Sequence, residues 1–315
     1  MFEVILLVFC LLLVCATFVA FWFAHSPRQT ARLPYFLKLT DRLLTLLSAL
    51  QQYRGMSVAQ LSGSHFFGRE LRAVEQKITG QFVLLIQDLD EESMQLFPCL
   101  QINEIKLLRH HWQSAIQQHQ TTTPSEVFQR QTQYIEQVMQ WLLRIGKRRL
   151  YPILSPLSRY QKRDLHGSKN VLKNYVEHLP ALAECIAQIR GLGTRLCVTR
   201  VVNELEKQRL LFLLNCAQLF LFNTGITVEN TTSNHTKINE TVSSLQPSPW
   251  RIINQAREEV TCFLKLTETT LISLQSISMA PPVFFSHGNK AVDAVYDWLK
   301  LERLRILEIK IEHIW

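Results

Sequence analysis

The stretch Ser48-Ala-Leu-Gln-Gln-Tyr-Arg-Gly-Met-Ser57 decides the fold, because it carries a charged residue on the apolar side of a helical pattern. Leucines recur along this pattern at the i, i+3, i+4 and i+7 spacing of a buried stripe, and Arg54 falls on the same register. These leucines are Leu43, Leu46, Leu47 and Leu50. A buried guanidinium needs an anionic or carbonyl partner, since an unpaired buried charge is very costly. The stretch therefore predicts a core helix built around one partnered arginine.

A second stretch, Ala183-Glu-Cys-Ile-Ala-Gln-Ile-Arg-Gly-Leu-Gly-Thr-Arg195, repeats this arrangement with Arg190 beside its apolar stripe. In both stretches a glycine follows the arginine, which removes a side chain where another helix or a small ligand could come close. A guanidinium fork matches a small planar anion, so Arg54 and Arg190 could converge on one. The alternative is that each arginine reaches water or pairs with a carboxylate of the chain.

The composition favours a folded, helical protein. Hydrophobic residues make up 47% of the 315 residues, and Gly and Pro number only 10 and 11, so the chain is not of the disordered class. Leucine and glutamine are abundant, whereas alternating runs of β-branched residues are scarce. The net charge of +8 permits contact with an anionic surface. No nucleic-acid-binding motif accompanies this charge, so we expect no nucleic-acid partner.

An uncharged apolar run from Val4 to Ala24 is long enough to cross a bilayer as one helix. A cleaved signal peptide would have basic residues before the run and small residues at its exit, where this chain has Phe21-Trp-Phe-Ala24. We therefore predict an uncleaved anchor in which residues 4–24 contact the membrane. Positive charges follow the run, so the main domain is predicted to be cytoplasmic. They are Arg28, Arg32, Lys38 and Arg42.

The remaining pattern predicts an all-α protein: an N-terminal transmembrane helix followed by two antiparallel four-helix bundles. The first bundle is expected to contain helices at about 35–61, 68–89, 92–118 and 125–145. The second contains the Arg190 helix and helices at about 201–222, 249–276 and 290–315, with a loop at 227–249. The predicted segments are the transmembrane anchor 1–25, a juxtamembrane linker 26–34, the first bundle 35–146, a basic linker 147–170 and the second bundle 171–315.

Three segments resemble the nitrate- and nitrite-sensing NIT domain of bacterial receptors. Ala49-Leu-Gln-Gln-Tyr-Arg-Gly-Met-Ser57 resembles the opening signature of that family, and Ile186-Ala-Gln-Ile-Arg-Gly-Leu-Gly-Thr-Arg195 resembles the segment that opens its second half. Phe284-Phe-Ser-His-Gly-Asn-Lys-Ala-Val-Asp-Ala-Val-Tyr296 looks like its closing segment. The resemblance covers about Leu39 to Ile311. It implies two four-helix bundles that hold nitrate or nitrite between them through arginines.

The resemblance also implies which residues bind the anion. Arg54 matches the first signature, Arg190 and Arg195 match the second, and Arg209 is a weaker candidate from the helix that follows. The chain departs from the family pattern at two places. Tyr53 stands where the family commonly has glutamate, and Asn289 stands where it has threonine.

Family members usually join this domain to an output module, such as a chemoreceptor signalling region, a cyclase or kinase, or an RNA-binding antiterminator. No such module is evident here, so we expect the signal to pass through an unknown signalling protein or through self-association. The resulting hypothesis is a single-pass sensor of the bacterial inner membrane. We expect neither catalysis nor a cofactor, and His110, His111 and His119 lack the spacing of metal ligands.

The alternative hypothesis is a ligand-free helical scaffold for protein-protein contact at the inner membrane. In the scaffold each arginine pairs with an acid of the chain, such as Glu184 or Glu204. The sensor hypothesis instead predicts arginine head groups that converge around a small polar cavity without carboxylates. The two hypotheses therefore differ in the partners that they predict for Arg54 and Arg190.

Overall fold

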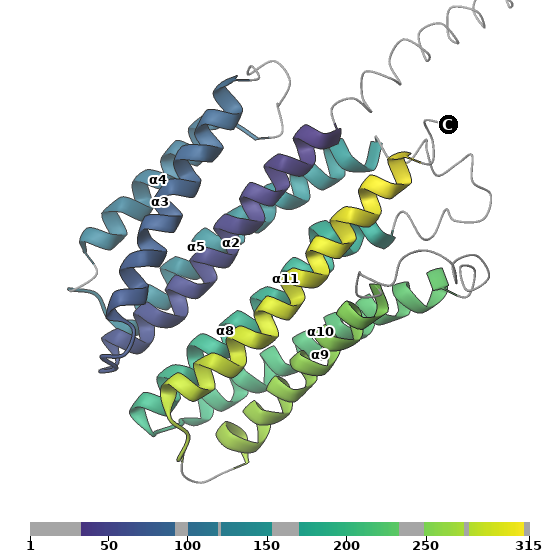
Figure 1. Cartoon of the computed structure of the whole chain (residues 1–315). Coiled ribbons are helices and arrows are strands. Elements are labelled where there is room, and N and C mark those ends of the chain that lie inside the picture. The colour runs from purple at the N-terminus through teal and green to yellow at the C-terminus, as the bar shows by residue number, and fades with distance from the viewer. Residues whose placement is uncertain are drawn as a thin grey trace, which may run out of the picture.

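The computed structural model describes residues 33–91, 100–118, 121–152, 170–232, 249–273 and 277–311. These residues form α-helices and short π-helical segments, without a strand among them, so the predicted all-α class is confirmed (Figure 1). The α-helices before the basic stretch are α2 (Leu33–Leu61), α3 (Gly68–Glu91), α4 (Ile102–Gln117) and α5 (Pro124–Ile145). Those after it are α8 (Leu179–Thr199), α9 (Glu204–Thr232), α10 (Pro249–Thr267) and α11 (Pro281–Ile311). The π-helical segments are η2 (Gly146–Leu150), η3 (Asn174–His178) and η4 (Glu268–Ile272).

The α-helices pack as two groups that meet along α2 and α8. In the first group α2 packs against α3 and α5, and α4 lies on α3. In the second group α8 packs against α9 and α11, and α10 lies on α11. Contact between α2 and α8 joins the groups, with α11 beside them (Figure 1). The two helices that carry the Arg-Gly pairs are therefore the central helices of the molecule.

Helix α2 is buried on more than the one predicted stripe. Leu43, Leu46, Leu47 and Leu50 are all fully buried, which confirms that stripe. Leu37 and Leu44, which lie off it, are buried as well. The reason is that α3, α5 and α8 surround the helix, and a helix enclosed in this way is hydrophobic around most of its circumference.

The predicted close approach at the arginine-glycine pairs is confirmed. A Cβ atom built on Gly191 would lie 3.4 Å from the Cα of Gly55, so α2 and α8 bring their backbones together at these two glycines. A Cβ on Gly55 would lie 3.0 Å from the Phe285 ring, so a side chain at Gly55 would have to displace that ring. Arg54 and Arg190 directly precede the two glycines, so this contact between α2 and α8 brings their side chains into the same region of the interior.

Helix α11 begins at Pro281, whereas the sequence predicted that the last helix begins at Lys290. The prediction was wrong because Pro281 and Pro282 occupy the first helical turn, where proline loses no hydrogen bond. Gly288 lies within the helix and receives the stem of Arg190, since a Cβ there would be 2.6 Å from Arg190 Cγ. The earlier start puts Asn289 on the helix that faces Arg190.

Three other boundaries also differ from the prediction. Helix α5 continues through η2 to residue 152, so Lys147, Arg148 and Arg149 are helical although they were assigned to the linker. Gly146 allows this packing, because a Cβ there would lie 2.7 Å from Val176 in η3. Residues 227–232 belong to α9 rather than to a loop. Helix α4 begins at Ile102, and the predicted start at residue 92 lies outside the described residues.

Among the described residues, none of the helices combines the length and the apolar character needed to cross a bilayer. The predicted anchor at residues 4–24 lies outside the described residues.

We predict that Gly193→Ala destabilises the protein. The new methyl group would overlap the buried Phe284 ring and lie 2.9 Å from Leu271 Cδ1. Overpacking of this kind costs about 1–3 kcal/mol, against a gain of about 1 kcal/mol in helix propensity. Denaturant unfolding should therefore show a net loss of up to about 2 kcal/mol.

The matched control is Gly80→Ala in α3, where a Cβ meets nothing within 4 Å. Here only helix propensity changes, so the free energy of unfolding should rise by up to about 1 kcal/mol. Equal effects of the two substitutions would contradict the close packing of α8 on α11.

Candidate functional site

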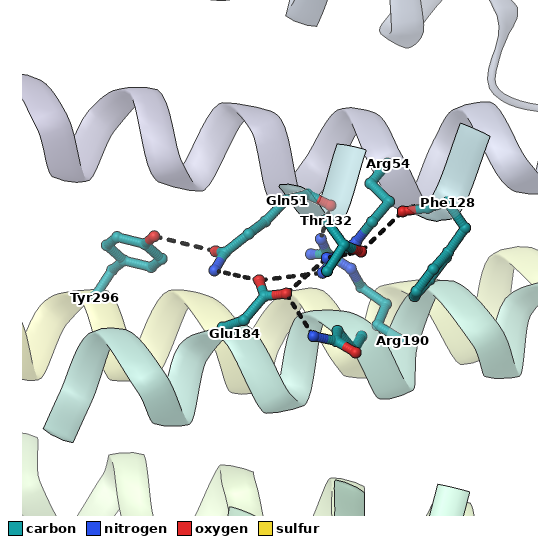
Figure 2. Close-up of polar contacts among 8 residues, drawn as sticks. Gln51, Arg54, Phe128, Thr132, Glu184, Arg190 and Tyr296 are labelled. Atoms are coloured by element: carbon teal, nitrogen blue, oxygen red, sulfur yellow. Dashed lines mark hydrogen bonds and ion pairs between the residues drawn. The ribbon is translucent and has the colours of Figure 1, made fainter. Parts of the chain in front are cut away.

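Arg54 is fully buried in α2 and forms a bidentate ion pair with Glu184 of α8. Its two terminal nitrogens donate to the two carboxylate oxygens at 2.6 and 3.1 Å (Figure 2). One of these nitrogens also donates to Thr132 Oγ1 of α5 at 3.0 Å. A single guanidinium thus ties together three helices, two of which belong to the first group and one to the second.

Glu184 accepts more hydrogen bonds than the two from Arg54. Gln51 donates to its Oε2 at 3.0 Å, and Gln188 donates to its Oε1 at 2.8 Å. The Gln51 amide in turn accepts from α11, because the Tyr296 hydroxyl donates to Gln51 Oε1 at 3.1 Å (Figure 2). With four hydrogen bonds the buried carboxylate is well satisfied.

Arg190 is buried as deeply as Arg54 but has neutral partners. Its terminal nitrogens donate to Asn289 Oδ1 at 2.6 Å and to the backbone oxygen of Gln51 at 2.8 Å. The guanidinium carbon lies 4.8 Å from the centre of the Phe285 ring. Burial, together with the charge of Arg54, lowers the pKa of Arg190 to about 10. The side chain is still charged at neutral pH, without a carboxylate bonded to it.

Both buried arginines keep an unused donor. The Nε atoms of Arg54 and Arg190 are buried and have no hydrogen-bond partner within the described part of the chain. A buried donor without an acceptor costs about 1–3 kcal/mol, and more when it is charged. The two central helices thus each contribute one buried donor that lacks an acceptor among the described residues.

Arg209 of α9 joins this group through an aromatic ring. Its guanidinium carbon lies 4.8 Å from the centre of the Phe128 ring, and that of Arg54 lies 4.9 Å from the same ring. Burial lowers the pKa of Arg209, and the positive charges of Arg54 and Arg195 lower it further. We call Arg54, Arg190 and Arg209 the arginine cluster.

Arg195, the fourth candidate ligand, is paired with an acid of the chain, and its charge acts on Arg209 of the cluster only through space. It forms a half-buried ion pair with Glu206 of α9. Glu206 also accepts from the backbone nitrogen of Asn203 at the start of that helix. Arg195 therefore fixes the junction between α8 and α9, and its pKa is lowered by burial.

The partners of the arginines agree fully with neither the sensor hypothesis nor the scaffold hypothesis. Arg54 is paired with Glu184, so the expectation of a site without carboxylates was wrong there. Arg190 has no bonded acid among the residues that the structure describes, so the expectation that every arginine is paired was wrong as well. A cavity of about 580 Å³ opens beside Tyr296 between α2 and α11, and none of the cluster arginines lines it. The two buried guanidiniums, Arg54 and Arg190, thus have one bonded carboxylate between them, while Asp293 interacts with Arg190 only through space.

Several residues of the site were not predicted as ligands. Gln51 precedes Arg54 by three positions, so helical spacing could have indicated it. Phe128 and Thr132 lie four positions apart on one face of α5, and neither belongs to a sequence motif that indicates a binding site. Tyr53, which departs from the family pattern, points elsewhere and packs edge-on against Trp112 with ring centres 4.7 Å apart.

Comparisons with known proteins give one match of fold. No family model and no curated protein sequence matches the chain. Among solved structures, the NasR transcription antiterminator superposes with a TM-score of 0.60. The chain has the fold of NasR. The superposition covers 93% of this chain and 74% of the NasR chain, at 14% sequence identity. At this identity the match with NasR establishes the arrangement of the helices and leaves the ligand open.

We predict that Glu184→Gln strongly destabilises the protein. The substitution keeps the size of the side chain but leaves the Arg54 charge buried without its counter-ion. Breaking one side of a buried ion pair costs about 3–5 kcal/mol. Denaturant unfolding of the two proteins at neutral pH measures the difference.

The control is Glu104→Gln, which breaks the partly exposed pair between Glu104 and Arg144. Exposed pairs contribute at most about 1 kcal/mol, so this variant should unfold almost like the parent. A small loss for Glu184→Gln would mean that Arg54 does not depend on the carboxylate.

Proposed function

We propose that this chain senses a small planar oxyanion, nitrate or nitrite, where Arg54 and Arg190 meet between the two helical groups. The observation that carries the proposal is the surplus of buried positive charge. The arginine cluster has one bonded carboxylate and two buried Nε donors without an acceptor. An additional anion would neutralise part of this charge and accept from the unused donors.

Glu184 occupies the position that an external anion would take on Arg54. A carboxylate and nitrite share a planar, bent arrangement of two oxygens with one negative charge, and a guanidinium fork accepts both. In the proposed mechanism the incoming anion replaces Glu184 on Arg54 and also receives the Nε donors. Displacing Glu184 breaks its bidentate link between α2 and α8. Binding therefore favours a different packing of the two groups, which is a shift between two populations.

Two independent likenesses support the sensor. The three sequence segments resemble the NIT domain, and two of them supply Arg54 and Arg190 of the cluster. The fold is shared with NasR, a transcription antiterminator. Arg195 is the candidate that the proposal leaves out of the site, because Glu206 engages it.

We propose the membrane tether from the sequence alone, on the uncharged run at residues 4–24 and the basic residues that follow it. With this anchor in the bacterial inner membrane the helical domain faces the cytoplasm and signals through a partner or through self-association. Fractionation of cells that produce the full chain, beside a chain without residues 1–25, tests the tether. Recovery of both chains in the soluble fraction would remove it from the proposal.

A ligand-free scaffold is the second candidate, and the Arg54–Glu184 pair favours it. In that protein the pair is a permanent internal contact, and the helical groups serve only to present surfaces to another protein. The scaffold gives no account of Arg190, whose charge is buried among neutral partners.

We predict that the full chain in detergent binds nitrate or nitrite with measurable heat in isothermal titration. Arg54→Ala combined with Arg190→Ala should abolish the heat, because both forks and both spare donors are removed. Glu184→Gln should bind at least about tenfold more tightly, since the competing carboxylate is gone and tenfold corresponds to only about 1.4 kcal/mol. Added nitrate should also raise the unfolding temperature of this variant.

Arg195→Ala is the matched control, because it removes an arginine of α8 that lies outside the cluster. Its affinity should stay within about twofold of the parent, a difference of well under 1 kcal/mol. Folded parent and Glu184→Gln proteins that give no heat with either anion would refute the sensor and leave the scaffold.

A further inference from the structure

We infer that two copies of this chain associate in parallel through one exposed face of α9. We call this face the α9 seam. The inference does not depend on the anion site. The seam consists of Leu205, Gln208, Phe212, Asn215, Leu219 and Phe222, all of which are exposed.

The seam exposes more apolar surface than the side of a helix that normally faces water. The exposed fractions are 76% for Leu205, 65% for Phe212, 57% for Leu219 and 62% for Phe222. The opposite side of α9 is already occupied, because Leu210, Leu213, Leu214 and Ala217 are buried where the helix packs on α8. Helix α9 thus has two apolar sides, and among the residues that the structure describes only one of them is covered. Contiguous apolar patches of this kind mark interaction sites.

The spacing along the seam is that of a coiled coil. Its members follow one another at intervals of three, four, three, four and three residues. This is the 3.5-residue repeat of two helices that supercoil, in which positions a and d of each heptad face the partner. Leu205, Phe212 and Leu219 take the a positions, while Gln208, Asn215 and Phe222 take the d positions. A second helix with the same seam fits this pattern along its whole length.

The two amides of the seam select a parallel arrangement. In a parallel pair each residue faces its own copy, so Gln208 meets Gln208 and Asn215 meets Asn215. An amide both donates and accepts, and each pair can therefore form hydrogen bonds with itself. The antiparallel alignment that buries the whole seam would place Asn215 opposite Phe212 and leave a buried amide without a partner. A lipid surface would leave both amides unsatisfied.

Charges beside the seam are complementary in the same parallel register. Glu204 takes a g position and Arg209 the e position five residues later, and g-to-e′ pairs of this kind set partner choice in parallel coiled coils. Both residues are exposed. Within the part of the chain that the structure describes, neither has an ion-pair partner of its own. Two such pairs, related by the two-fold axis, would flank the start of the seam.

The size of the seam suits a specific contact. The four apolar side chains leave about 100 Å² each exposed, given that side chains of this size bury roughly 150–250 Å² when fully covered. With the amides and the flanking residues, two copies would bury on the order of 1,000–1,200 Å² in total, which is the lower end of specific protein-protein interfaces. Arg209 belongs both to this contact and to the arginine cluster, so association would touch the anion site directly.

The first test is the oligomeric state of the full chain in detergent, measured by size-exclusion chromatography with light scattering. The parent should have twice the protein mass of one chain. Phe212→Glu should raise the dissociation constant at least tenfold, because it places two like charges within the seam. The matched control is Leu107→Glu on α4, which adds the same charge at a residue that is 56% exposed but outside the seam, and it should remain dimeric.

Charge reversal then tests the register. Glu204→Arg should weaken the dimer by bringing two arginines together, and the double variant Glu204→Arg with Arg209→Glu should restore it. Circular dichroism on each variant establishes that the helices are intact. A monomeric parent, or a parent whose Phe212→Glu variant stays dimeric, would overturn the inference. Binding to anionic liposomes tests the other occupant. A monomeric parent that binds liposomes and loses this binding on Phe212→Glu would also overturn the inference, since the seam would then contact lipid.

Cysteine cross-linking decides the direction of the two helices. Leu205→Cys and Phe222→Cys, each introduced alone into the full chain, should form disulfide-linked dimers above the level given by the natural cysteines. In an antiparallel dimer the two substituted positions would face each other, so cross-links would form only when both variants are mixed. Leu107→Cys is the control for random collision. Cross-linking limited to the mixture, or equal to that control, would contradict the parallel seam.

Discussion

The ion pair between Arg54 and Glu184 is the interaction on which the rest of the structure depends. Each of these ions costs several kcal/mol to remove from water, and only a partner with good geometry offsets this cost. The pair meets that requirement through two parallel hydrogen bonds between α2 and α8, at 2.6 and 3.1 Å. Because Gln51, Gln188 and Thr132 complete its hydrogen bonding, α2, α5 and α8 must all keep their registers.

The glycines that follow the two arginines make this interaction possible. Gly55 and Gly191 bring two backbones together, and an arginine side chain can then cross from one helical group to the other. Arg190 crosses in the opposite direction to Arg54, reaching the backbone oxygen of Gln51 on α2. Gly288 gives the stem of Arg190 room on α11. The dense packing thus creates the surplus of buried positive charge that the proposed anion would neutralise.

The proposed anion site and the proposed dimer meet at one residue. Arg209 lies over the same ring as Arg54, and its position on α9 puts it beside the seam. A change in the charge of the cluster would therefore alter the position of Arg209, and with it the pairing available to a second copy. Coupling of this kind works in both directions, since a ligand that favours one arrangement is itself favoured by it.

The sequence by itself determined the helical class, the buried stripe of α2 and the position of Arg54 on that stripe. These follow from local rules: apolar spacing of 3.6 residues, and the rule that a charge on an apolar face needs a partner. The sequence-based prediction misplaced the start of α11. Prolines and glycines usually end helices, but here Pro281 and Pro282 lie in the first turn and Gly288 packs against the stem of Arg190.

Only the tertiary structure decided which partner each arginine has. Arg54 and Glu184 are 130 positions apart, and Arg190 and Asn289 are 99 apart, so no local pattern contains either contact. The same holds for Phe128, which became part of the site only because α5 packs on α2. Spacing along a helix fixes the face on which a side chain lies, whereas its partner depends on how whole helices pack.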